Sequence, residues 1–393
     1  MHGIAIGGHI SAARIFVRRR VVPLLLYGTV AAFFLLPDNV ALNKTYYALV
    51  TPLTLFALGG ADFARLWHHT TLRWITAFIA FMTLSAAWTS GEPAESTGAL
   101  LLFAASTLVF VLLICACDLD RLDRLHPWCA GITTLHIGVI SVAWYTTHAI
   151  DEPLEAIGRL DHPLELASVY ASMAAMSLVR YTQAPGPRRL PYLVAVVACV
   201  VAILLTGRRG PLLAFAAVGL LVVAYDRNAH AAKLIAALLI GCAALLLLEP
   251  ALMGQLMERG TSLRPAIWIE GWQRIRDDGA WVFGHGAGAS TALAVGNLAV
   301  RHYHDILLST LFYGGLVGAA LLLGMLATIV RDGLRVPASH PWLAAFGAGV
   351  GCLLTNGDRI VIHPHPVWLY FWLPATVVAM YSSSTSLPPA KNT

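Results

Sequence analysis

Long apolar runs recur along almost the whole chain, and each is bounded by charged residues, proline or glycine. The runs are roughly 16 to 28 residues long, which brackets the length that a helix needs to cross a bilayer. Lipid offers no hydrogen-bond partners, so a crossing segment must satisfy its backbone internally, as a helix does. The chain is 58% hydrophobic and only 12% charged, far from the composition of soluble proteins. We therefore predict an all-α integral membrane protein.

Twelve segments carry this pattern, and we predict a transmembrane helix over each of them. They are residues 21–36, 45–60, 72–89, 97–116, 127–147, 163–181, 190–206, 209–225, 231–248, 303–330, 341–356 and 366–381. The one sizeable interruption is a loop over about residues 249–302, in which Pro250–Met257 and Ser262–Arg276 have helical patterns. The chain thus divides into helices one to nine in 1–248, the loop in 249–302, helices ten to twelve in 303–381, and a disordered tail in 382–393.

Lysines and arginines are unevenly distributed between the two sets of loops. With the N-terminus in the cytoplasm, 16 of the 26 fall on the cytoplasmic side, as the positive-inside rule requires. Both termini are then cytoplasmic, and the 249–302 loop lies on the outer side. The other ten basic residues are Lys44, Arg159, Arg208, Arg209, Arg259, Arg264, Arg274, Arg276, Arg301 and Arg359.

Arginine dominates this outer set, in which only Lys44 is a lysine. Guanidinium groups bind phosphate oxygens in a bidentate fork, whereas an ammonium group acts as a point charge. Arg208 and Arg209 occupy a tight turn between two apolar runs, where the charge bias disfavours them. Contacts with lipid headgroups or with neighbouring carboxylates would also account for single arginines. We expect at least two of the outer arginines to bind a phosphate-bearing ligand together.

The loop closes on Arg301-His302-Tyr303-His304-Asp305, directly before the tenth apolar run. Ionisable side chains at a membrane boundary are costly to keep and usually mark function. A neutral imidazole at His304 is able to accept a proton near physiological pH. A zinc site built from His302, His304, His363 and His365 is the alternative, but no helical His-Glu-x-x-His pair supports it, and we expect no metal.

The second helical pattern of the loop is amphipathic. Ile267, Trp268, Trp272 and Ile275 share one face at three- and four-residue spacing. Tryptophans in this pattern suit a helix that lies at the membrane interface, and packing against the protein core explains them equally well.

Several short elements follow one another in a fixed order. They are Gly158-Arg159 with His162-Pro163, Arg209-Gly210, Arg264-Pro265-Ala266-Ile267-Trp268, Gly284-His285-Gly286, and His304-Asp305-Ile306-Leu307-Leu308 with Gly314, Gly315 and Gly318. In this order they resemble the signature of the O-antigen ligase family, which O-antigen polymerases and bacterial protein O-oligosaccharyltransferases share. Three positions depart from it, because Asp305 stands where the family has asparagine, Arg208 where serine is commoner, and His162 where asparagine is frequent.

The resemblance implies a multi-pass protein of the bacterial inner membrane with a periplasmic active site. It implies an inverting glycosyltransferase that moves a preassembled polysaccharide from undecaprenyl diphosphate to a sugar hydroxyl of lipid A–core. The implied partners are these two substrates and membrane lipids, with no nucleic acid. No nucleotide, metal or other cofactor is expected, because the lipid diphosphate already activates the sugar.

The family's motifs also imply roles for single residues. His304 would orient or deprotonate the acceptor hydroxyl, and Arg264 would stabilise the departing diphosphate, as the two catalytic residues. Arg209 would hold the diphosphate together with Arg264. Further candidates for diphosphate binding are Arg208, Arg159 and Arg301, and the expected rim of the pocket comprises His302, Asp305, Trp268 and Arg359.

Three other functions stay open at this point. An O-antigen polymerase uses the same donor but a second lipid-linked glycan as acceptor, and a protein O-oligosaccharyltransferase uses a protein. The non-enzymatic alternative is a lipid or solute transporter, in which inverted repeats and helices broken at the bilayer midplane are expected. The sequence contains no such repeats, which favours an enzyme.

Overall fold

The structure is a computed structural model, and it describes residues 11–90, 93–149, 152–155, 158–226, 228–249, 253–254, 263–296 and 298–385. Helices form most of it. In the first half they are η1 (Val17–Val21), α2 (Val22–Leu35), α3 (Asn39–Thr45), η2 (Tyr46–Val50), α4 (Thr51–Ala57), α5 (Gly60–His68), α6 (Thr70–Leu84), η3 (Ser85–Trp88), α7 (Thr97–Cys115), α8 (Leu119–Tyr145) and α9 (Pro163–Gln183). In the second half they are η4 (Gly186–Arg189), α10 (Leu190–Leu205), α11 (Arg209–Asp226), α12 (Ala229–Leu248), α14 (Arg264–Asp278), α15 (Ile306–Arg335), η5 (Pro337–Ser339), α16 (His340–Asn356), η6 (Trp368–Trp372) and α17 (Leu373–Thr385).

A helix, or a run of consecutive helices, overlies each of the twelve predicted segments. Six helices within the described residues are long and apolar enough to cross a membrane. A seventh crossing is added if Asn39–Ala57 and the strongly bent Asp62–His68 are counted as one span. The chain is thus a helical membrane protein, and the remaining crossings stay a prediction.

The 249–302 loop contains more structure than its pattern indicates. Helix α14 (Arg264–Asp278) coincides with the second predicted short helix, whereas Pro250–Met257 lies mostly outside the described residues. An antiparallel hairpin of β1 (Leu293–Val295) and β2 (Leu298–Val300) follows, which the sequence did not predict. At the C-terminus, α17 continues to Thr385, so the predicted disordered tail begins with helical residues, and the rest of it lies outside the described residues.

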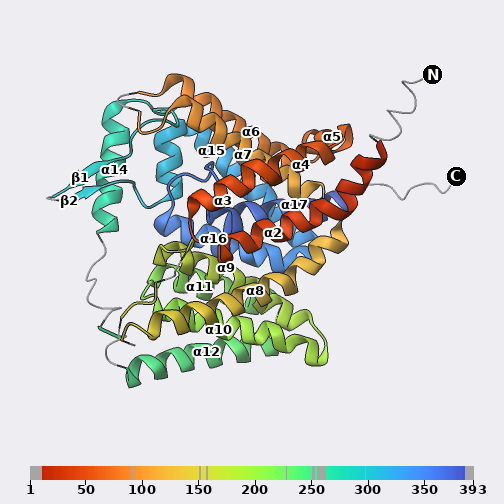
Figure 1. The fold of residues 1–393 in the computed structure, drawn as a ribbon. Coiled ribbons are helices and arrows are strands. Elements are labelled where there is room, and N and C mark those ends of the chain that lie inside the picture. The colour runs from red at the N-terminus through yellow and green to blue at the C-terminus, as the bar shows by residue number, and fades with distance from the viewer. Residues whose placement is uncertain are drawn as a thin grey trace.

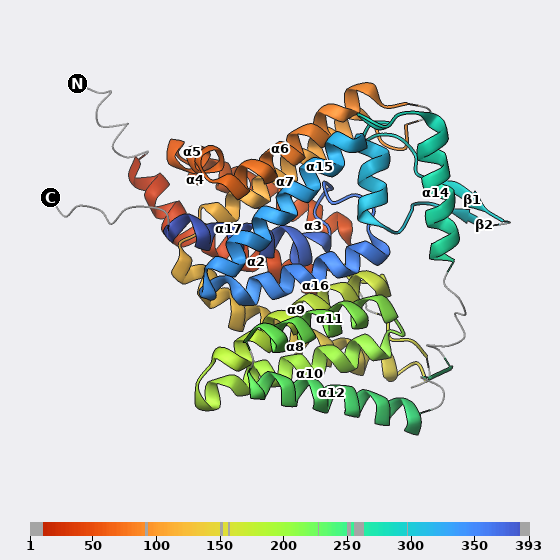
Figure 2. The same cartoon turned by 180° about the vertical axis from the view of Figure 1, so that it is seen from behind.

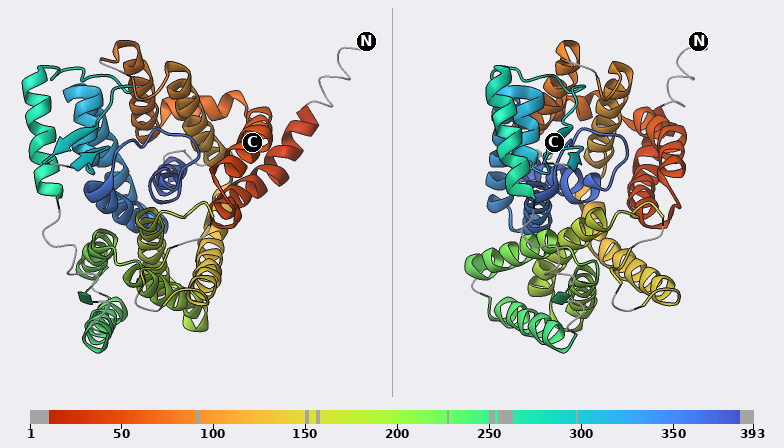
Figure 3. Two further views of the ribbon diagram at one scale, coloured as in Figure 1. Left: turned by 60° about the vertical axis from the view of Figure 1, so that its left-hand side comes forward. Right: turned by 90° about the vertical axis from the view of Figure 1, so that its left-hand side faces the viewer.

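The long helices run broadly in one direction, with α14 and the β1–β2 hairpin at one end of the bundle and α5 at the other (Figures 1 and 2). Helix α14 runs across the ends of the long helices (Figure 1). Helix α16 packs against α9 and α11, while α15 packs against α6. Further views place α17 in the middle of the surrounding helices (Figure 3), and the side chains of η6 and the first part of α17 are buried. We call the two ends the α14 end and the α5 end.

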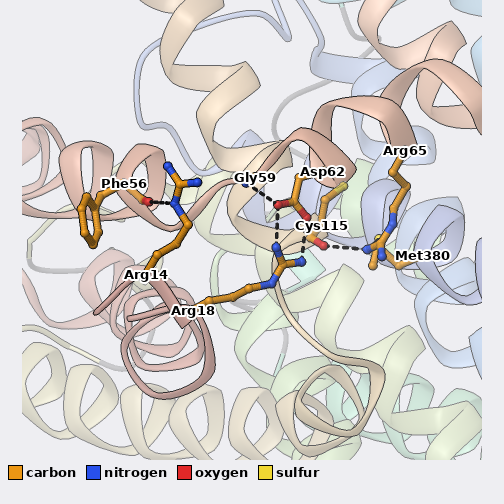
Figure 4. A network of polar contacts seen from close by, with 8 residues as sticks. All are labelled: Arg14, Arg18, Phe56, Gly59, Asp62, Arg65, Cys115 and Met380. Atoms are coloured by element: carbon orange, nitrogen blue, oxygen red, sulfur yellow. Dashed lines mark hydrogen bonds and ion pairs between the residues drawn. The ribbon is translucent and has the colours of Figure 1, made fainter. Parts of the chain in front are cut away.

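A polar network fixes the first helices at the α5 end (Figure 4). Arg18 donates two hydrogen bonds to the Asp62 carboxylate, at 2.6 and 2.7 Å, and Asp62 is completely buried. Asp62 also accepts from the backbone N–H of Gly59, the N-cap residue of α5. Arg65 donates to the Cys115 carbonyl at the end of α7. Because every charge of the buried pair is hydrogen-bonded, the network connects η1, α5 and α7 without an unpaired buried charge.

At the α14 end, a loop interrupts helix α15 and replaces its hydrogen bonds. Gly315 lies inside α15 with φ 60° and ψ −159°, so the helix breaks there. In an unbroken helix the N–H groups of Leu316 and Val317 would donate to residues four positions earlier. Instead they donate to Trp281 and Val282, at 2.7 and 3.1 Å.

The carbonyl groups freed by the same break are also satisfied. Phe312 and Tyr313 accept from the N–H groups of His285 and Gly286, at 2.8 and 2.9 Å. The 281–286 segment therefore inserts into the helix and satisfies all four groups, which a break inside a membrane protein requires. This insertion gives the Gly-x-Gly element a structural role: a Cβ on Gly284 would lie 2.5 Å from the backbone N of Gly315.

We predict that Gly284→Ala destabilises this junction. Gly284 has φ 69°, so alanine costs left-handed strain as well as the steric overlap. Gly279→Ala is the matched control, because Gly279 has φ 71° but open space around its Cβ position. We expect G284A to lose about 1–3 kcal/mol more than G279A, seen as a lower melting temperature of the detergent-solubilised protein. Equal melting temperatures for the two variants would show that the junction tolerates a side chain.

Candidate functional site

His304 stands in the short link between the hairpin and α15, at the α14 end of the bundle. Its φ is 55°, and within the described ranges it is the one residue other than glycine that has a positive φ. A left-handed backbone costs an L-residue about 1–2 kcal/mol, so surrounding contacts must hold it there. Strain of this kind is concentrated at functional sites.

Asp305, which follows His304, forms the N-cap of α15. Its Oδ1 accepts from the backbone N–H of Leu308 at 2.7 Å. Burial raises the pKa of Asp305, and hydrogen bonds from backbone N–H groups of α15 partly offset that rise. Asparagine and aspartate cap helices about equally well, so Asp305 can take the place of the family's asparagine without loss of the cap. The electrostatic effects on the His304 pKa come from other groups.

Asn356, the last residue of α16, holds the His304 ring. The ring Nδ1 lies 2.9 Å from Asn356 Oδ1, so Nδ1–H donates to the amide oxygen and Nε2 keeps its lone pair. Gly357 makes this contact possible, because a Cβ there would lie 2.8 Å from the Cβ of Ile306, at the start of α15. The close approach of two segments thus fixes the tautomer in which Nε2 is a base.

Burial and neighbouring basic groups lower the pKa of the His304 imidazole. Burial lowers the pKa of His304 most, and repulsion from His302 and Arg264 lowers it further, while the Asn356 hydrogen bond and Asp358 oppose the shift. The ring centroid of His302 is 3.9 Å from that of His304. Burial likewise lowers the pKa of His302, with Asp358 opposing. Both rings are therefore neutral near pH 7, which is the state that accepts a proton.

Arg264 is the first residue of α14 and lies within electrostatic range of His304. Helix α14 is held by Ile267 and Ile275, which are buried, and by Arg274, whose guanidinium lies 4.8 Å from the ring centre of Phe312 on α15. The positive end of the α14 dipole adds to the charge of Arg264. One face of α14 thus packs on the protein, and its first turn offers a site for an anion beside His304.

Asp358 lies two residues beyond Asn356 and connects the site to α15. It accepts a hydrogen bond from the Tyr313 hydroxyl at 3.0 Å. The Arg359 guanidinium stacks over the Tyr313 ring at 4.8 Å and pairs with Glu95 at 4.0 Å. A small cavity of about 20 Å³ adjoins these residues, and Phe78 and Met82 of α6 form part of its wall.

Arg159 belongs to a second charged cluster, separate from the cluster around His304. It is 4% exposed and pairs with Glu165 at 3.6 Å, and Glu165 in turn accepts from His365 Nε2 at 3.0 Å. Burial lowers the pKa of Arg159, and Glu165 and Asp161 oppose that shift. His162 interacts electrostatically with both Glu165 and His302, so it links the two clusters.

The remaining candidate arginines differ in their exposure. Gly210 packs against Thr355 near the end of α16, so the Arg208–Arg209 turn lies beside the segment that carries Asn356. The Arg208 side chain is partly buried there, whereas Arg209 is exposed. Arg301 is exposed as well, but it interacts with His302.

Two residues of the expected rim have structural contacts. Arg359 donates to the Ala289 carbonyl at 3.2 Å and so holds the loop that follows the Gly-x-Gly element. Trp268 lies on α14 and is partly buried, while Trp272 on the same helix is 47% exposed and packs edge-on against Trp281. The helix therefore packs in part on the protein, and its place at a membrane interface stays a prediction.

The four histidines of the alternative zinc site fall into the two clusters. His302 and His304 adjoin each other, whereas His363 and His365 lie beside Glu165 and Phe103. No group of three or more His, Cys, Asp or Glu side chains in the part of the chain that the structure describes is arranged to hold a metal ion.

The chain is similar in sequence to known proteins. Residues 194–323 match the family described as O-Antigen ligase. The chain is 28% identical over 377 residues to the O-antigen ligase of Pseudomonas aeruginosa PAO1, and the match covers 91% of this chain and 90% of that protein. Both matches point to the O-antigen ligase family.

The family match spans much of the first cluster but does not reach all of its residues. It includes Arg208, Arg264 and His304 and ends inside α15. Arg159 precedes it, and Asn356 and Asp358 follow it. Packing in the bundle, and not proximity in the sequence, brings these last residues to the site.

Asn356 and Asp358 are the residues that sequence reasoning missed. A signal for them exists, because Asn356-Gly357-Asp358-Arg359 is a polar run directly after an apolar helix. The reasoning that singled out Arg301 to Asp305, polar groups at a membrane boundary, applies equally to this run. The sequence does not indicate which side chains this run contacts.

Proposed function

We propose that this protein is an O-antigen ligase that transfers a preassembled polysaccharide from undecaprenyl diphosphate to a sugar hydroxyl of lipid A–core, at the periplasmic face of the inner membrane. The family assignment supports this class of reaction. The observation that carries the proposal is the strained His304, whose Nδ1 is bound by Asn356 and whose Nε2 is left as a base near Arg264.

The reaction is a displacement at the anomeric carbon of the donor. The acceptor oxygen forms a bond to this carbon, the bond from the carbon to the diphosphate oxygen breaks, and the configuration inverts. The proton of the acceptor hydroxyl passes to His304 Nε2, and the electron pair of the broken bond leaves with the diphosphate. Asn356 keeps the ring in the required tautomer and orientation throughout.

Negative charge develops on the diphosphate as it leaves. Arg264 and the N-terminus of α14 stabilise that charge from fixed positions, which is most effective where water is scarce. The partly buried Arg208 and the neighbouring Arg209 hold the distal phosphate, with Arg301 and Arg159 as further donors.

Reconstitution with defined acceptors tests the function. The purified protein is supplied with lipid-linked glycan together with lipid A–core, with lipid-linked glycan alone, or with a carrier protein rich in serine. We expect a product with lipid A–core only. Longer glycans formed from the donor alone would indicate a polymerase, and a glycosylated protein would indicate an O-oligosaccharyltransferase. Transport of intact donor across liposomes without transfer would indicate a transporter.

The pH profile reports the electrostatics around His304. A base must be deprotonated, so activity falls as the pH drops below the pKa of His304. Removal of a nearby positive charge raises that pKa, and removal of a nearby negative charge lowers it. We therefore expect the acidic limb to move to higher pH in His302→Gln and to lower pH in Asp358→Asn, measured as initial transfer rates of the folded variants.

The exposed residue Glu270 on α14 provides the control for this measurement. Glu270→Gln changes the net charge by the same amount as Asp358→Asn but should leave the limb in place. Shifts of the same sign in His302→Gln and Asp358→Asn would contradict the assignment of the base.

A further inference from the structure

A pocket rich in arginine lies in the half of the bundle away from α14, outside the site described above. It contains about 790 Å³ of space, part of it open to solvent, and lies between the N-terminal part of α8, the end of α9 and the start of α10. The short helix η4 between α9 and α10 forms one wall. Its polar lining consists of Arg180, Gln183, Arg188 and the hydroxyl-bearing ring of Tyr192.

The charge in this pocket is positive and is not neutralised by a carboxylate. None of the residues that line it is acidic. Among the described residues, no ion pair within 4.0 Å involves Arg180, Arg188 or the adjacent Arg189. Asp123 is an acidic residue of α8, but its carboxylate has another partner: it accepts from the Tyr381 hydroxyl at 2.6 Å.

Two aromatic rings hold the guanidinium groups in place. Arg180 lies 5.8 Å from the ring centre of Tyr192, and Arg189 lies 5.9 Å from that of Tyr181. Each contact joins the end of α9 to η4 or α10, so the two arginines and two tyrosines form reciprocal pairs across the connection. The Nε of Arg180 is buried and makes no hydrogen bond to the described protein. A fixed guanidinium with an unused donor is suited to an anionic oxygen.

The surroundings of the pocket point to a lipid. Leu190, Val194, Val197 and Val201 are large apolar side chains that are exposed on α10. Their spacing places them on one face of α10, and the first of them, Leu190, directly precedes Pro191 of the pocket lining. A headgroup in the pocket would thus have its acyl chains continue along α10. We infer that this pocket binds the phosphate of an anionic phospholipid at the end of the bundle opposite His304.

Lipid binding to delipidated protein tests this site. Native mass spectrometry measures the affinity for phosphatidylglycerol, with phosphatidylcholine as the zwitterionic comparison. Arg180→Gln with Arg188→Gln removes two charge-assisted contacts, and we expect at least about tenfold weaker binding of phosphatidylglycerol. The matched control is Arg19→Gln with Arg20→Gln, because these arginines are exposed on η1 and the same charge is lost. The control should bind as the unmodified protein does.

Loss of arginine near a membrane can also disturb folding, so a second variant retains the charge. Arg180→Lys with Arg188→Lys keeps both positive charges but removes the bidentate fork. We expect its affinity to lie between those of the unmodified protein and the glutamine variant, with an unchanged melting temperature. Unchanged binding in either folded variant would overturn the inference, as would equal weakening in the Arg19 and Arg20 control.

The phosphate has two possible sources, and competition distinguishes them. Inorganic phosphate in large excess should leave phosphatidylglycerol bound, because it lacks the acyl chains that contact α10. Displacement of the lipid by an equal concentration of inorganic phosphate would show a site for free phosphate and would overturn the lipid assignment. Equal affinity for phosphatidylcholine would also overturn it, because a net negative headgroup would then not be required.

Discussion

Replacement of His304 by asparagine should reduce polysaccharide transfer by about 10²- to 10⁴-fold, the usual contribution of a general base. Asparagine is the informative choice because His304 has φ 55°, and asparagine tolerates this left-handed backbone better than other residues with a Cβ. The variant thus loses the imidazole Nε2 while it keeps the link between the hairpin and α15. The rate is measured with saturating donor and lipid A–core in detergent or proteoliposomes.

Two further variants separate chemistry from folding. His304→Ala loses the base and also incurs the full left-handed strain, so it should be as inactive as His304→Asn but melt at a lower temperature. His302→Gln leaves the base in place and should retain most of the activity at neutral pH. A folded His304→Asn protein that transfers at the unmodified rate would remove His304 from the mechanism.

Replacement of Arg264 by glutamine should lower the turnover number by about 10²- to 10³-fold, the cost of removing one fixed donor from developing negative charge. The expected effect falls on turnover more than on donor affinity, because charge on the diphosphate grows as the glycosidic bond breaks. Turnover and donor affinity are measured separately, from initial rates across donor concentrations and from direct binding of the donor.

Lysine at the same position tests the geometry of the contact. Arg264→Lys retains a positive charge but offers no planar fork, so it should recover only part of the lost rate. Arg276→Gln is the control on the same helix, because Arg276 is exposed and pairs with its neighbour Asp277. Full activity of Arg264→Lys would reduce the role of Arg264 to general attraction, and equal losses in Arg264→Gln and Arg276→Gln would indicate a nonspecific effect of charge.

The sequence predicted the helices well because their signal is local. Apolar runs of bilayer length have one stable backbone solution, so the segments that begin near residues 97, 163 and 341 needed no tertiary information. The sequence also placed His304 and Arg264 in one functional set, through their motif order and their position at a polar boundary. It gave no reason for the Gly-x-Gly element, which the structure explains by the insertion of 281–286 into the break at Gly315.

The sequence pattern did not indicate which of the outer arginines are buried and which are exposed. Arg208 and Arg209 are neighbours with the same charge, yet one side chain is partly buried and the other exposed. Arg159 was expected to bind the ligand. Its pairing with Glu165, on α9, depends on how α9 packs in the bundle. These differences depend on how each helix is rotated and how deeply it is buried in the bundle. The residue type at a single position determines neither.

The sequence by itself determined a helical membrane protein, because hydrophobic length and backbone hydrogen bonding act over neighbouring residues. Only the tertiary structure decided that Asn356 and Asp358 are the partners of the histidines. That pairing depends on the close approach of Gly357 to the start of α15. Such an approach is set by how whole helices pack, since the contact joins residues far apart in the chain and neither one carries a local signal of the other.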